Sequence, residues 1–461
     1  MNIAKTYGSI VRRRLGSNPQ KAGKLIRTGL HLEGFRVRRL QGKEMPKAYR
    51  YLNYKSLKLV ADALDHPETY AWTNIFAPVE LLRSFGLTCV SMECLASYLS
   101  GFYLEDYFID RAENTGIAPT LCAYHKNFIG AVEEGIVPLP VMSVTTSMVC
   151  DGNINTFRYT KERFGVDDFV LDVPHEDTPE AEEYLVSQLK ELITILEAKT
   201  GRTYDPARLK AAIRRENESR KYYQIFLEKR RTHAYPNTLT LVLFMLFATH
   251  LDIGSPWSLK FFQMLAEDID NYPADTAKRL FWVHLTPYAQ PTLRKYLNFN
   301  RDYAIVCDDF NMDFMEQLDP ERPLHALAHK MIANIYNGDF TRKSKAIAAY
   351  VQQYDMDAVV EFCHWGCKQS CGGAMMLKEE MRKIGMPMLI LDGDALDRRN
   401  CHDGQIRTRF EAFLELLRRE HKSGTETGTE TGTKAGTGTK TEGEAAAEAA
   451  GTDPANEGNH L

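Results

Sequence analysis

The 461-residue sequence lacks the features of a membrane or secreted protein. Its most apolar stretch, Leu239 to Ala248, is too short to cross a bilayer, which takes about 20 apolar residues. The N-terminus, Met1 to Lys24, contains basic residues but no continuous apolar segment of the kind found in secretory signal peptides. We therefore expect a cytoplasmic protein.

The sequence also lacks the signals of several classes of binding protein and enzyme. A net charge of −4, without a basic stripe interleaved with aromatic residues, argues against binding to nucleic acid. The sequence contains no GxxxxGK[ST] phosphate loop and no isolated dinucleotide fingerprint. Nine cysteines, an odd number in a chain without a signal peptide, favour a reducing compartment, where clustered cysteines are more often metal ligands than disulfides.

The composition, with 44% apolar and 26% charged residues, is that of an ordinary globular protein, and the length predicts two or three domains. Short apolar strands alternate with helices in two stretches, which predicts an α/β fold of two Rossmann-like parallel-sheet domains with an added helical region. The predicted divisions are a mostly helical region at 1–73, an α/β domain at 74–235, a helical bridge at 236–279, a second α/β domain at 280–420 and a disordered low-complexity tail at 421–461.

Three cysteines lie close together in the segment Phe362 to Gly373, at the predicted turn from a buried strand to a helix. In open parallel sheets, ligands bind at this carboxyl end of the strands. Cys363, Cys367 and Cys371 are four residues apart, which matches neither the CxxxCxxC run of radical enzymes nor the CxxCxxC run of ferredoxins. We therefore expect this loop to supply one metal ligand, Cys367 on the turn, and the other two to be buried small side chains.

Two further cysteines occupy similar positions. Cys122 opens a predicted helix, and Cys150 follows an apolar strand, so backbone N–H groups and the helix dipole are expected to lower the pKa of both thiols. With Cys367 they could hold an iron–sulfur cluster with one open iron between the two α/β domains. The alternative is that they are structural, as we expect for the remaining cysteines, Cys89, Cys94, Cys307 and Cys401.

These segments resemble the 2-hydroxyacyl-CoA dehydratase family, which includes the small subunits of ATP-dependent benzoyl-CoA reductase. The resemblance runs from about residue 70 to 418, with its pieces in the family's order. It is carried by Pro78–Leu82, Leu121–Gly130, Cys150–Gly152, Val173–Pro174, Glu183–Leu185, His364–Lys368, Leu391–Asp394 and Thr408–Glu415.

The resemblance implies a hydro-lyase of anaerobic amino-acid fermentation that removes water from an (R)-2-hydroxyacyl-CoA through a ketyl radical, giving the 2-enoyl-CoA. It implies a [4Fe–4S] cluster on Cys122, Cys150 and Cys367, in the cleft between the two α/β domains. The implied partners are a homologous second subunit, forming a heterodimer, and a separate ATP-dependent iron–sulfur activator. Because the chain has no phosphate loop of its own, we expect it to receive the electron.

Glu80 matches a carboxylate of the family that faces the substrate, and we assign it to proton transfer. The alternative is a solvated glutamate in the first turn of a helix, where acidic residues are favoured. His125 and His364 could donate hydrogen bonds to sulfur or substrate, although a histidine beside an aromatic residue is more often structural. Cys363 or Cys371 could replace Cys367 as the ligand, because they flank it by one helical turn.

Two other functions remain open at this stage. The chain could be a subunit of an ATP-dependent acyl-CoA reductase, of the benzoyl-CoA or the double-cubane-cluster type. It could also be a non-catalytic sister subunit of a dehydratase. The motifs are shared by enzymes acting on hydroxyglutaryl, lactoyl and phenyllactyl groups, so they do not identify the acyl group or the subunit that activates it.

Overall fold

A computed structural model describes residues 3–40, 42 and 44–426. Met1–Leu417 form one compact unit, and Arg418–Leu461 form a second. Of the predicted tail, residues 427–461 lie outside the described residues, and those before them continue α18 (Asp403–Glu426). Within the described part of the chain, no helix combines the length and apolarity needed to span a membrane.

The first sheet contains four parallel strands in the order β2-β1-β3-β4. The strands are β1 (Tyr70–Thr73), β2 (Thr88–Ser91), β3 (Met142–Thr146) and β4 (Asp168–Leu171). They are connected through α4 (Val79–Ser84), α5 (Met92–Gly101), α6 (Glu105–Glu113), α7 (Ala123–Glu133) and α8 (Asp151–Phe164).

The sequence also predicts a short strand from Asn74 to Pro78, because Ile75 to Ala77 are apolar. This prediction is wrong, since the strand ends at Thr73. Ile75, Phe76 and Ala77 lie in the turn that follows and line a small cavity, which accounts for their apolar character.

The second sheet repeats this topology, with the parallel order β6-β5-β7-β8. Its strands are β5 (Lys278–Val283), β6 (Tyr303–Asp308), β7 (Ala358–His364) and β8 (Met388–Gly393). The helices of this part are α13 (Pro291–Leu297), α14 (Pro323–Ile332), α15 (Phe340–Gln353), α16 (Lys368–Gly372), α17 (Ala374–Lys383) and α18. The prediction of an α/β fold with two parallel sheets is confirmed, whereas the predicted domain boundaries stay a prediction.

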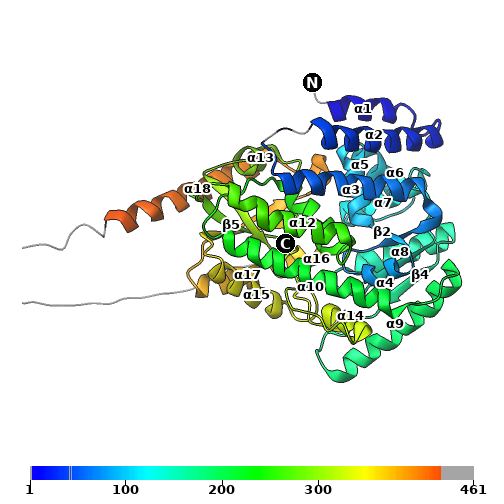
Figure 1. The fold of residues 1–461 in the computed structure, drawn as a ribbon. Helices are drawn as coiled ribbons and strands as arrows, with labels where there is room; N and C mark the ends of the chain where they lie inside the picture. The colour runs from blue at the N-terminus through cyan, green and yellow to red at the C-terminus, as the bar shows by residue number, and fades with distance from the viewer. Residues whose placement is uncertain (1–2, 41, 43, 427–461) are drawn as a thin grey trace, which may run out of the picture. The chain divides into compact units, whose positions relative to one another are not determined.

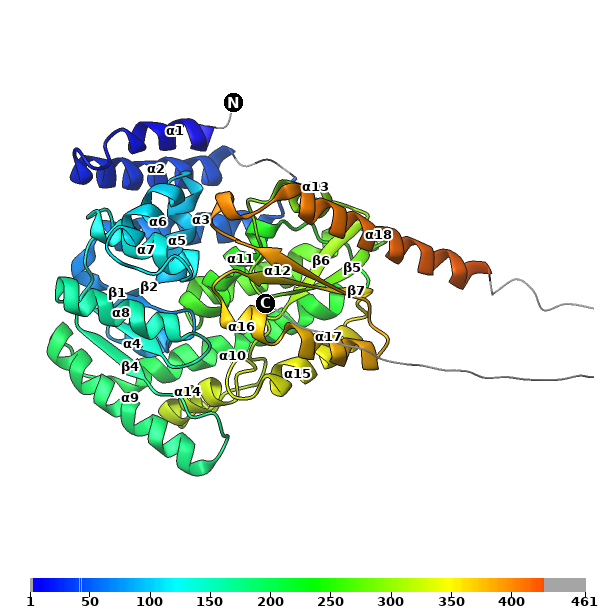
Figure 2. The same cartoon turned by 180° about the vertical axis from the view of Figure 1, so that it is seen from behind.

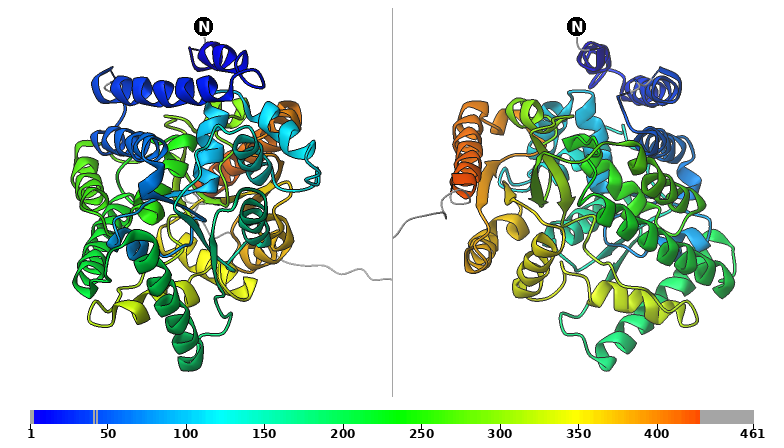
Figure 3. Two further views of the ribbon diagram at one scale, coloured as in Figure 1. Left: turned by 90° about the vertical axis from the view of Figure 1, so that its right-hand side faces the viewer. Right: turned by 60° about the vertical axis from the view of Figure 1, so that its left-hand side comes forward.

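The remaining helices flank and connect the sheets. At the N-terminus, α1 (Ile3–Arg12) and α2 (Pro19–Leu40) stack outside α3 (Lys47–Asp65) (Figure 3). Between the sheets in sequence come α9 (Pro179–Thr200), α10 (Pro206–Lys229), α11 (Leu239–Leu246), the π-helical turn η2 (Phe247–Leu251) and α12 (Pro256–Asp268). Short 3-10 turns complete the element order: η1 (Pro67–Thr69), η3 (Ile269–Asn271) and η4 (Arg398–Asn400).

Capping residues define the two ends of α9. The Thr178 side chain accepts a hydrogen bond from the Ala181 N–H at 3.2 Å, and Gly201 ends the helix with φ +66°. Asp205 caps α10 in the same way, accepting from the Ala207 N–H at 2.9 Å. These caps satisfy N–H groups that the first turn of each helix leaves unpaired.

The strand order fixes where a site can form. In each sheet the first strand lies between the second and the third, so the connections leave β1 and β3, and likewise β5 and β7, toward opposite sides. Ligands bind at such switch points, beyond the carboxyl ends of the strands. In views from opposite sides, α10 and α16 lie between the two sheets (Figure 1, Figure 2).

Candidate functional site

The three predicted cysteines each precede the first residue of a helix. Cys122 precedes α7, Cys150 follows β3 and precedes α8, and Cys367 follows β7 and precedes α16. They lie close enough to interact electrostatically: Cys367 and Cys150 both act on the thiol of Cys122, and Cys367 acts on that of Cys150. The structure therefore brings together three cysteines that are far apart in the sequence.

Glycines permit this convergence. A Cβ atom at Gly366 would lie 2.6 Å from the backbone nitrogen of Cys122, so the β7–α16 loop packs directly against the loop that carries Cys122. A Cβ atom at Gly152 would lie 2.8 Å from His125 Nε2 and 3.2 Å from Cys150 Sγ. Any side chain at either position would force these loops apart.

Each of the three sulfurs faces a different imidazole. Cys122 Sγ lies 3.1 Å from His364 Nε2, Cys150 Sγ lies 3.4 Å from His125 Nε2, and Cys367 Sγ lies 3.5 Å from His284 Nε2. We call these six residues the thiol site. Both histidines considered from the sequence, His125 and His364, thus contact sulfur, whereas His284 was missed.

The protonation of His364 follows from its neighbours. Burial, with smaller contributions from His125 and Lys126, lowers the pKa of His364 to about 3, so the ring is neutral. Its Nδ1 atom accepts a hydrogen bond from the Ala395 N–H at 3.0 Å. The proton therefore sits on Nε2, which donates to the sulfur of Cys122. Donors to sulfur of this kind tune the potential of iron–sulfur clusters.

The expectation that the helix positions lower the thiol pKa values is wrong. Burial raises the pKa of Cys150 to about 12 and that of Cys122 well above its ordinary value, and the neighbouring thiols raise both further. Backbone N–H groups at Tyr124 and Asn153 oppose this, but their effect is smaller than that of desolvation.

The backbone around the thiol site adopts left-handed conformations at three strand ends. Val149, one residue before Cys150, has φ +68°; His284 has φ +71°; and Gly366, one residue before Cys367, has φ +79°. Glycine tolerates this region, but a β-branched valine is strained there. Strained residues of this kind concentrate at functional sites, where they aim side chains.

The donor set decides which metal group would fit. Within residues 3–40, 42 and 44–426, no three side chains of His, Cys, Asp or Glu converge as ligands of a single metal ion. A cubane cluster binds its cysteines at separate irons, so its sulfurs need not converge on one point. Soft thiolates are the ligands that iron–sulfur clusters use, and an imidazole stands beside each of the three sulfurs, so the thiol site fits such a cluster.

The flanking cysteines have different surroundings. Cys363 Sγ lies 3.3 Å from the Ser370 carbonyl oxygen, and Cys371 Sγ lies 3.4 Å from the His364 carbonyl oxygen. Cys363 is buried, as expected, whereas Cys371 is exposed, so the expectation of a buried side chain is wrong for Cys371. No imidazole contact to either is found among the described residues, in contrast to Cys367.

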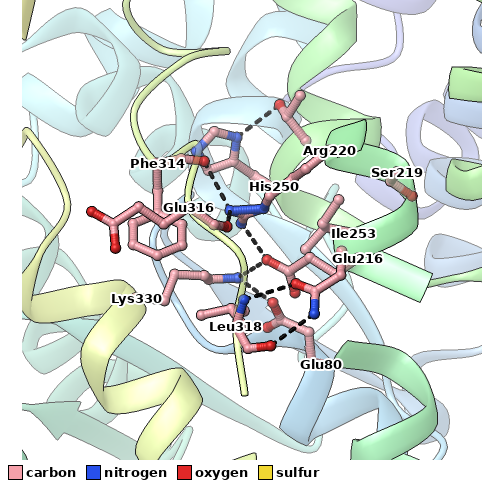
Figure 4. Close-up of polar contacts among 12 residues, drawn as sticks. Glu80, Glu216, Ser219, Arg220, His250, Ile253, Phe314, Glu316, Leu318 and Lys330 are labelled. Atoms are coloured by element: carbon pink, nitrogen blue, oxygen red, sulfur yellow. Dashed lines mark hydrogen bonds and ion pairs between the residues drawn. The ribbon is translucent and has the colours of Figure 1, made fainter. Parts of the chain in front are cut away.

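Glu80, the predicted proton-transfer residue, lies in the first turn of α4 but is fully buried, so the alternative of a solvated glutamate is wrong. Its Oε1 atom pairs with the ammonium group of Lys330 on α14. The same ammonium lies 3.1 Å from Oε1 of Glu216 on α10, and Glu216 also pairs with Arg220 (Figure 4). We call Glu80, Glu216, Arg220 and Lys330 the carboxylate site.

The pKa values of the two carboxyl groups of this site are shifted in opposite directions. Desolvation raises the pKa of Glu80 to about 7, with Lys330 opposing and Glu216 adding to the shift. For Glu216, Lys330 and Arg220 outweigh desolvation and lower the pKa to about 2. Two interacting carboxyls with opposite shifts are typical of acid–base sites.

A cavity of about 20 Å³ adjoins the carboxylate site and has room for about one water molecule. Arg220 and Lys330 line it together with Ala77, three residues before Glu80, and Met148, two residues before Cys150. The cavity therefore joins the β1–α4 turn to the loop that carries Cys150. Its wall also includes His250, whose Nε2 lies 3.0 Å from Asp313 Oδ2.

Comparison with known protein families shows which family the chain matches. The profile of the 2-hydroxyglutaryl-CoA dehydratase D-component family matches residues 74–417. The chain belongs to this family. The family recognised from the sequence motifs is therefore confirmed, over almost the same range.

Several characterised members of the family resemble the chain at low identity. The (R)-phenyllactyl-CoA dehydratase alpha subunit of Clostridium sporogenes is 21% identical over 383 residues, 77% of this chain and 91% of the relative. The lactoyl-CoA dehydratase subunit alpha of Anaerotignum propionicum is 21% identical over 414 residues, 82% and 97% respectively. A benzoyl-CoA reductase subunit of Thauera aromatica is 19% identical over 347 residues, 66% and 78%.

Proposed function

We propose that this protein is the [4Fe–4S]-cluster subunit of a 2-hydroxyacyl-CoA dehydratase, which eliminates water from an (R)-2-hydroxyacyl-CoA to give the 2-enoyl-CoA. Family membership over residues 74–417 and relatives named as dehydratase alpha subunits support this function. The observation that carries the proposal is the proximity of three cysteines from separate loops, each beside an imidazole.

In this proposal Cys122, Cys150 and Cys367 hold the cluster. A cluster held by these three sulfurs would supply the one-electron chemistry and the Lewis acidity that the elimination requires. The chain's own part is to orient and shield. His364 holds its N–H toward the sulfur of Cys122, and the burial of both side chains keeps water away from that sulfur.

The elimination also moves protons, because the β-hydrogen leaves as a proton and the hydroxyl group leaves as water. We assign this transfer to Glu80, whose raised pKa of about 7 allows it to hold and release a proton near neutrality. Lys330 keeps the Glu80 carboxyl in place beside the cavity.

The proposed partners follow from the comparisons and from the sequence. Because the dehydratase relatives are alpha subunits, we expect a homologous second subunit. Because the sequence has no phosphate loop, an ATP-dependent iron–sulfur activator would deliver the electron. We expect each chain to carry its own cluster.

A reductase is the second candidate, supported by the similarity to the benzoyl-CoA reductase chain of Thauera aromatica. A double-cubane reductase would need roughly twice as many cluster thiols. Cys89, Cys94 and Cys307 are buried cysteines outside the Phe362–Gly373 loop, and burial raises the pKa of each. If replacing them singly leaves the iron content unchanged, the double-cubane assignment fails.

The test is anaerobic reconstitution with the second subunit and the activator, followed by a panel of 2-hydroxyacyl-CoA esters. We expect ATP-dependent loss of water from at least one ester, and about four irons per chain. A Glu80→Gln complex that retains its iron should lose turnover, whereas unchanged turnover would indicate a non-catalytic sister subunit. Reduction of an aromatic acyl-CoA without dehydration would favour the reductase. A protein that stays colourless after reconstitution would contradict both.

A further inference from the structure

Two buried carboxyl groups in the carboxylate site share one ammonium group. Glu80 and Glu216 are both fully buried, and each presents its Oε1 atom to Lys330 Nζ (Figure 4). They come from different helices, α4 and α10, and Lys330 comes from a third, α14. This arrangement places two acids side by side in a region without bulk water.

The second oxygen of each carboxyl is unsatisfied. Within the described part of the chain, neither Oε2 of Glu80 nor Oε2 of Glu216 has a hydrogen-bond partner. Leaving a buried acceptor unpaired is costly, and more so when it carries charge. The two carboxyls lie close enough for a hydrogen bond once one of them is protonated. A single proton held between the two carboxyl groups would therefore reduce this cost.

We propose that Glu80 and Glu216 share one proton between their carboxyl groups, and that Glu216 and Lys330 are positioning residues that hold this proton beside the cavity next to Met148. The opposite pKa shifts of the two groups support this arrangement and place the proton on Glu80 near neutral pH. Lys330 lines the cavity and contacts both acids, so it connects the pair to the cavity.

The other charged groups around the pair are already engaged. Arg220 donates to the carbonyl oxygens of Phe314 and Glu316 as well as to Glu216. On α4, Arg83 pairs with Asp252, and on α10 the Arg215 Nε donates to the Gly254 carbonyl oxygen.

Two further titratable groups face this region. The Cys89 thiol of β2 is kept neutral by burial, which raises its pKa. Asp313 is paired with His250. The Arg220 Nε has no hydrogen-bond partner among the described residues, and none of these groups donates to the two orphaned oxygens.

The role of the pair rests on the proposed dehydratase function. Glu80 would give its proton to the departing hydroxyl group, forming water, and the pair would then take up the β-hydrogen as a proton. The acid is regenerated in each turnover, and the substrate loses one H and one OH in total. The cavity has room for about one water molecule, and this water would carry the proton between the carboxyl pair, on the Lys330 side, and the substrate.

Infrared spectroscopy of the purified full-length chain, in H₂O and D₂O between pH 5 and 8, tests the shared proton without substrate or activator. Subtracting the Glu80→Gln spectrum from that of the wild type should leave the C=O band of one protonated carboxyl, fading with a midpoint near pH 7. In Glu216→Gln the band should be absent at pH 6, because Glu80 then ionises against Lys330. In Lys330→Met the midpoint should move to higher pH, because the opposing cation is gone.

Glu361→Gln is the matched control. Glu361 is another fully buried glutamate without hydrogen-bond partners among the described residues, and burial raises its pKa to about 8. This variant should lose a band of its own and leave the Glu80 midpoint unchanged. Far-UV circular dichroism establishes that each variant is folded, and Lys330→Met answers the question if Glu216→Gln does not fold.

A featureless difference between the wild type and Glu80→Gln would overturn the proposal. So would a Glu80 midpoint that neither Glu216→Gln nor Lys330→Met changes. Turnover and its pH–rate profile distinguish failure of the shared proton from failure of the proposed dehydratase function. If the band behaves as expected but no 2-hydroxyacyl-CoA is dehydrated, the shared proton stands and the proposed function fails. In an active complex, Glu216→Gln should shift the acid limb of the profile to lower pH, whereas a purely structural residue would lower the rate at every pH.

Discussion

The thiol site and the carboxylate site both connect the two halves of the chain, but their electrostatics are opposite. In the thiol site, burial raises the pKa of Cys122 and Cys150 and lowers the pKa of His364, so a neutral thiol faces a neutral imidazole at the contact between Cys122 and His364. In the carboxylate site, Glu216 is held ionised by Lys330 and Arg220.

This difference shows what each site lacks. Neutral thiols become metal ligands only when they lose their protons, and a bound metal supplies the positive charge that drives this loss. The thiol site is therefore completed by a cationic group. The carboxylate site already contains its cations and is completed by a proton. Variants that remove a thiol, a cation, a proton site or an imidazole test this contrast.

Removing a predicted thiol ligand should have the largest effect. Cys150→Ala and Cys367→Ala should lower the iron content after anaerobic reconstitution from about four per chain to a small fraction, because a cluster that loses one of its three cysteines is poorly held. Iron and sulfide analysis with the visible absorption spectrum measures this loss.

Cys371→Ala is the control, since Cys371 is exposed and its sulfur contacts the His364 carbonyl oxygen rather than an imidazole. It should retain its iron. Loss of iron in Cys371→Ala together with full iron in Cys367→Ala would show that the ligand had been assigned to the wrong cysteine of this loop.

Removing the shared cation should destabilise the fold. Lys330→Met leaves the buried Glu216 with one cation instead of two, and breaking a buried ion pair costs about 3–5 kcal/mol. Urea unfolding measures the change. Lys368→Met is the matched control, because Lys368 pairs with Asp151 at the surface, with 87% of the lysine side chain exposed. The control should be neutral, and equal effects of the two variants would show that the carboxylate site is not an electrostatic unit.

The sequence predicted the two sites unequally, for a physical reason. Cys122, Cys150 and Cys367 precede helices, and Cys150 and Cys367 come shortly after strands of the two different sheets. The local pattern therefore places Cys150 and Cys367 beyond the carboxyl ends of strands, where ligands bind. His284 directly follows β5 and so occupies a similar position, but it was not singled out from the sequence.

Glu216 and Lys330 gave no comparable signal. Glu216 lies in the polar stretch from Arg214 to Arg220, which is typical of a solvated helix face. Its burial is decided by the packing of α10 between α4 and α14, and no periodicity within α10 reveals that contact. The same limit applies to Ile75–Ala77, where apolar residues that line a cavity were taken for a strand.

The proton on Glu80 predicts a pH dependence of stability. The folded pKa of about 7 lies above the ordinary value of 4.5, so the native state binds this proton more tightly. The stabilisation is present at low pH and is lost as pH rises from about 4.5 through about 7, a change of about 3 kcal/mol. The unfolding free energy of the wild type minus that of Glu80→Gln should fall by this amount over that range.

Glu216 should give the opposite dependence, because its pKa is lowered to about 2. Its contribution is lost as pH falls below about 4.5, so the wild type should lose stability relative to Glu216→Gln only in acid. A flat difference for Glu80→Gln across pH 5 to 8 would indicate that Glu80 is ionised in the native state, and the contrast between the two acids would disappear.

The smallest of these effects concerns the imidazoles. His364→Ala removes the N–H that faces Cys122 and leaves the Ala395 N–H without its acceptor, but it keeps all three thiols. Loss of such a supporting partner lowers metal affinity or activity about 10–100-fold, which is milder than loss of a ligand. Iron retention during titration with a chelator measures the affinity. His329→Ala, at a half-exposed histidine that pairs with Glu316, is the control and should not change it. If His364→Ala retains iron as well as this control does, the imidazoles serve only to pack the core; if it loses iron as completely as Cys150→Ala, His364 is itself a ligand and the three-cysteine assignment must be revised.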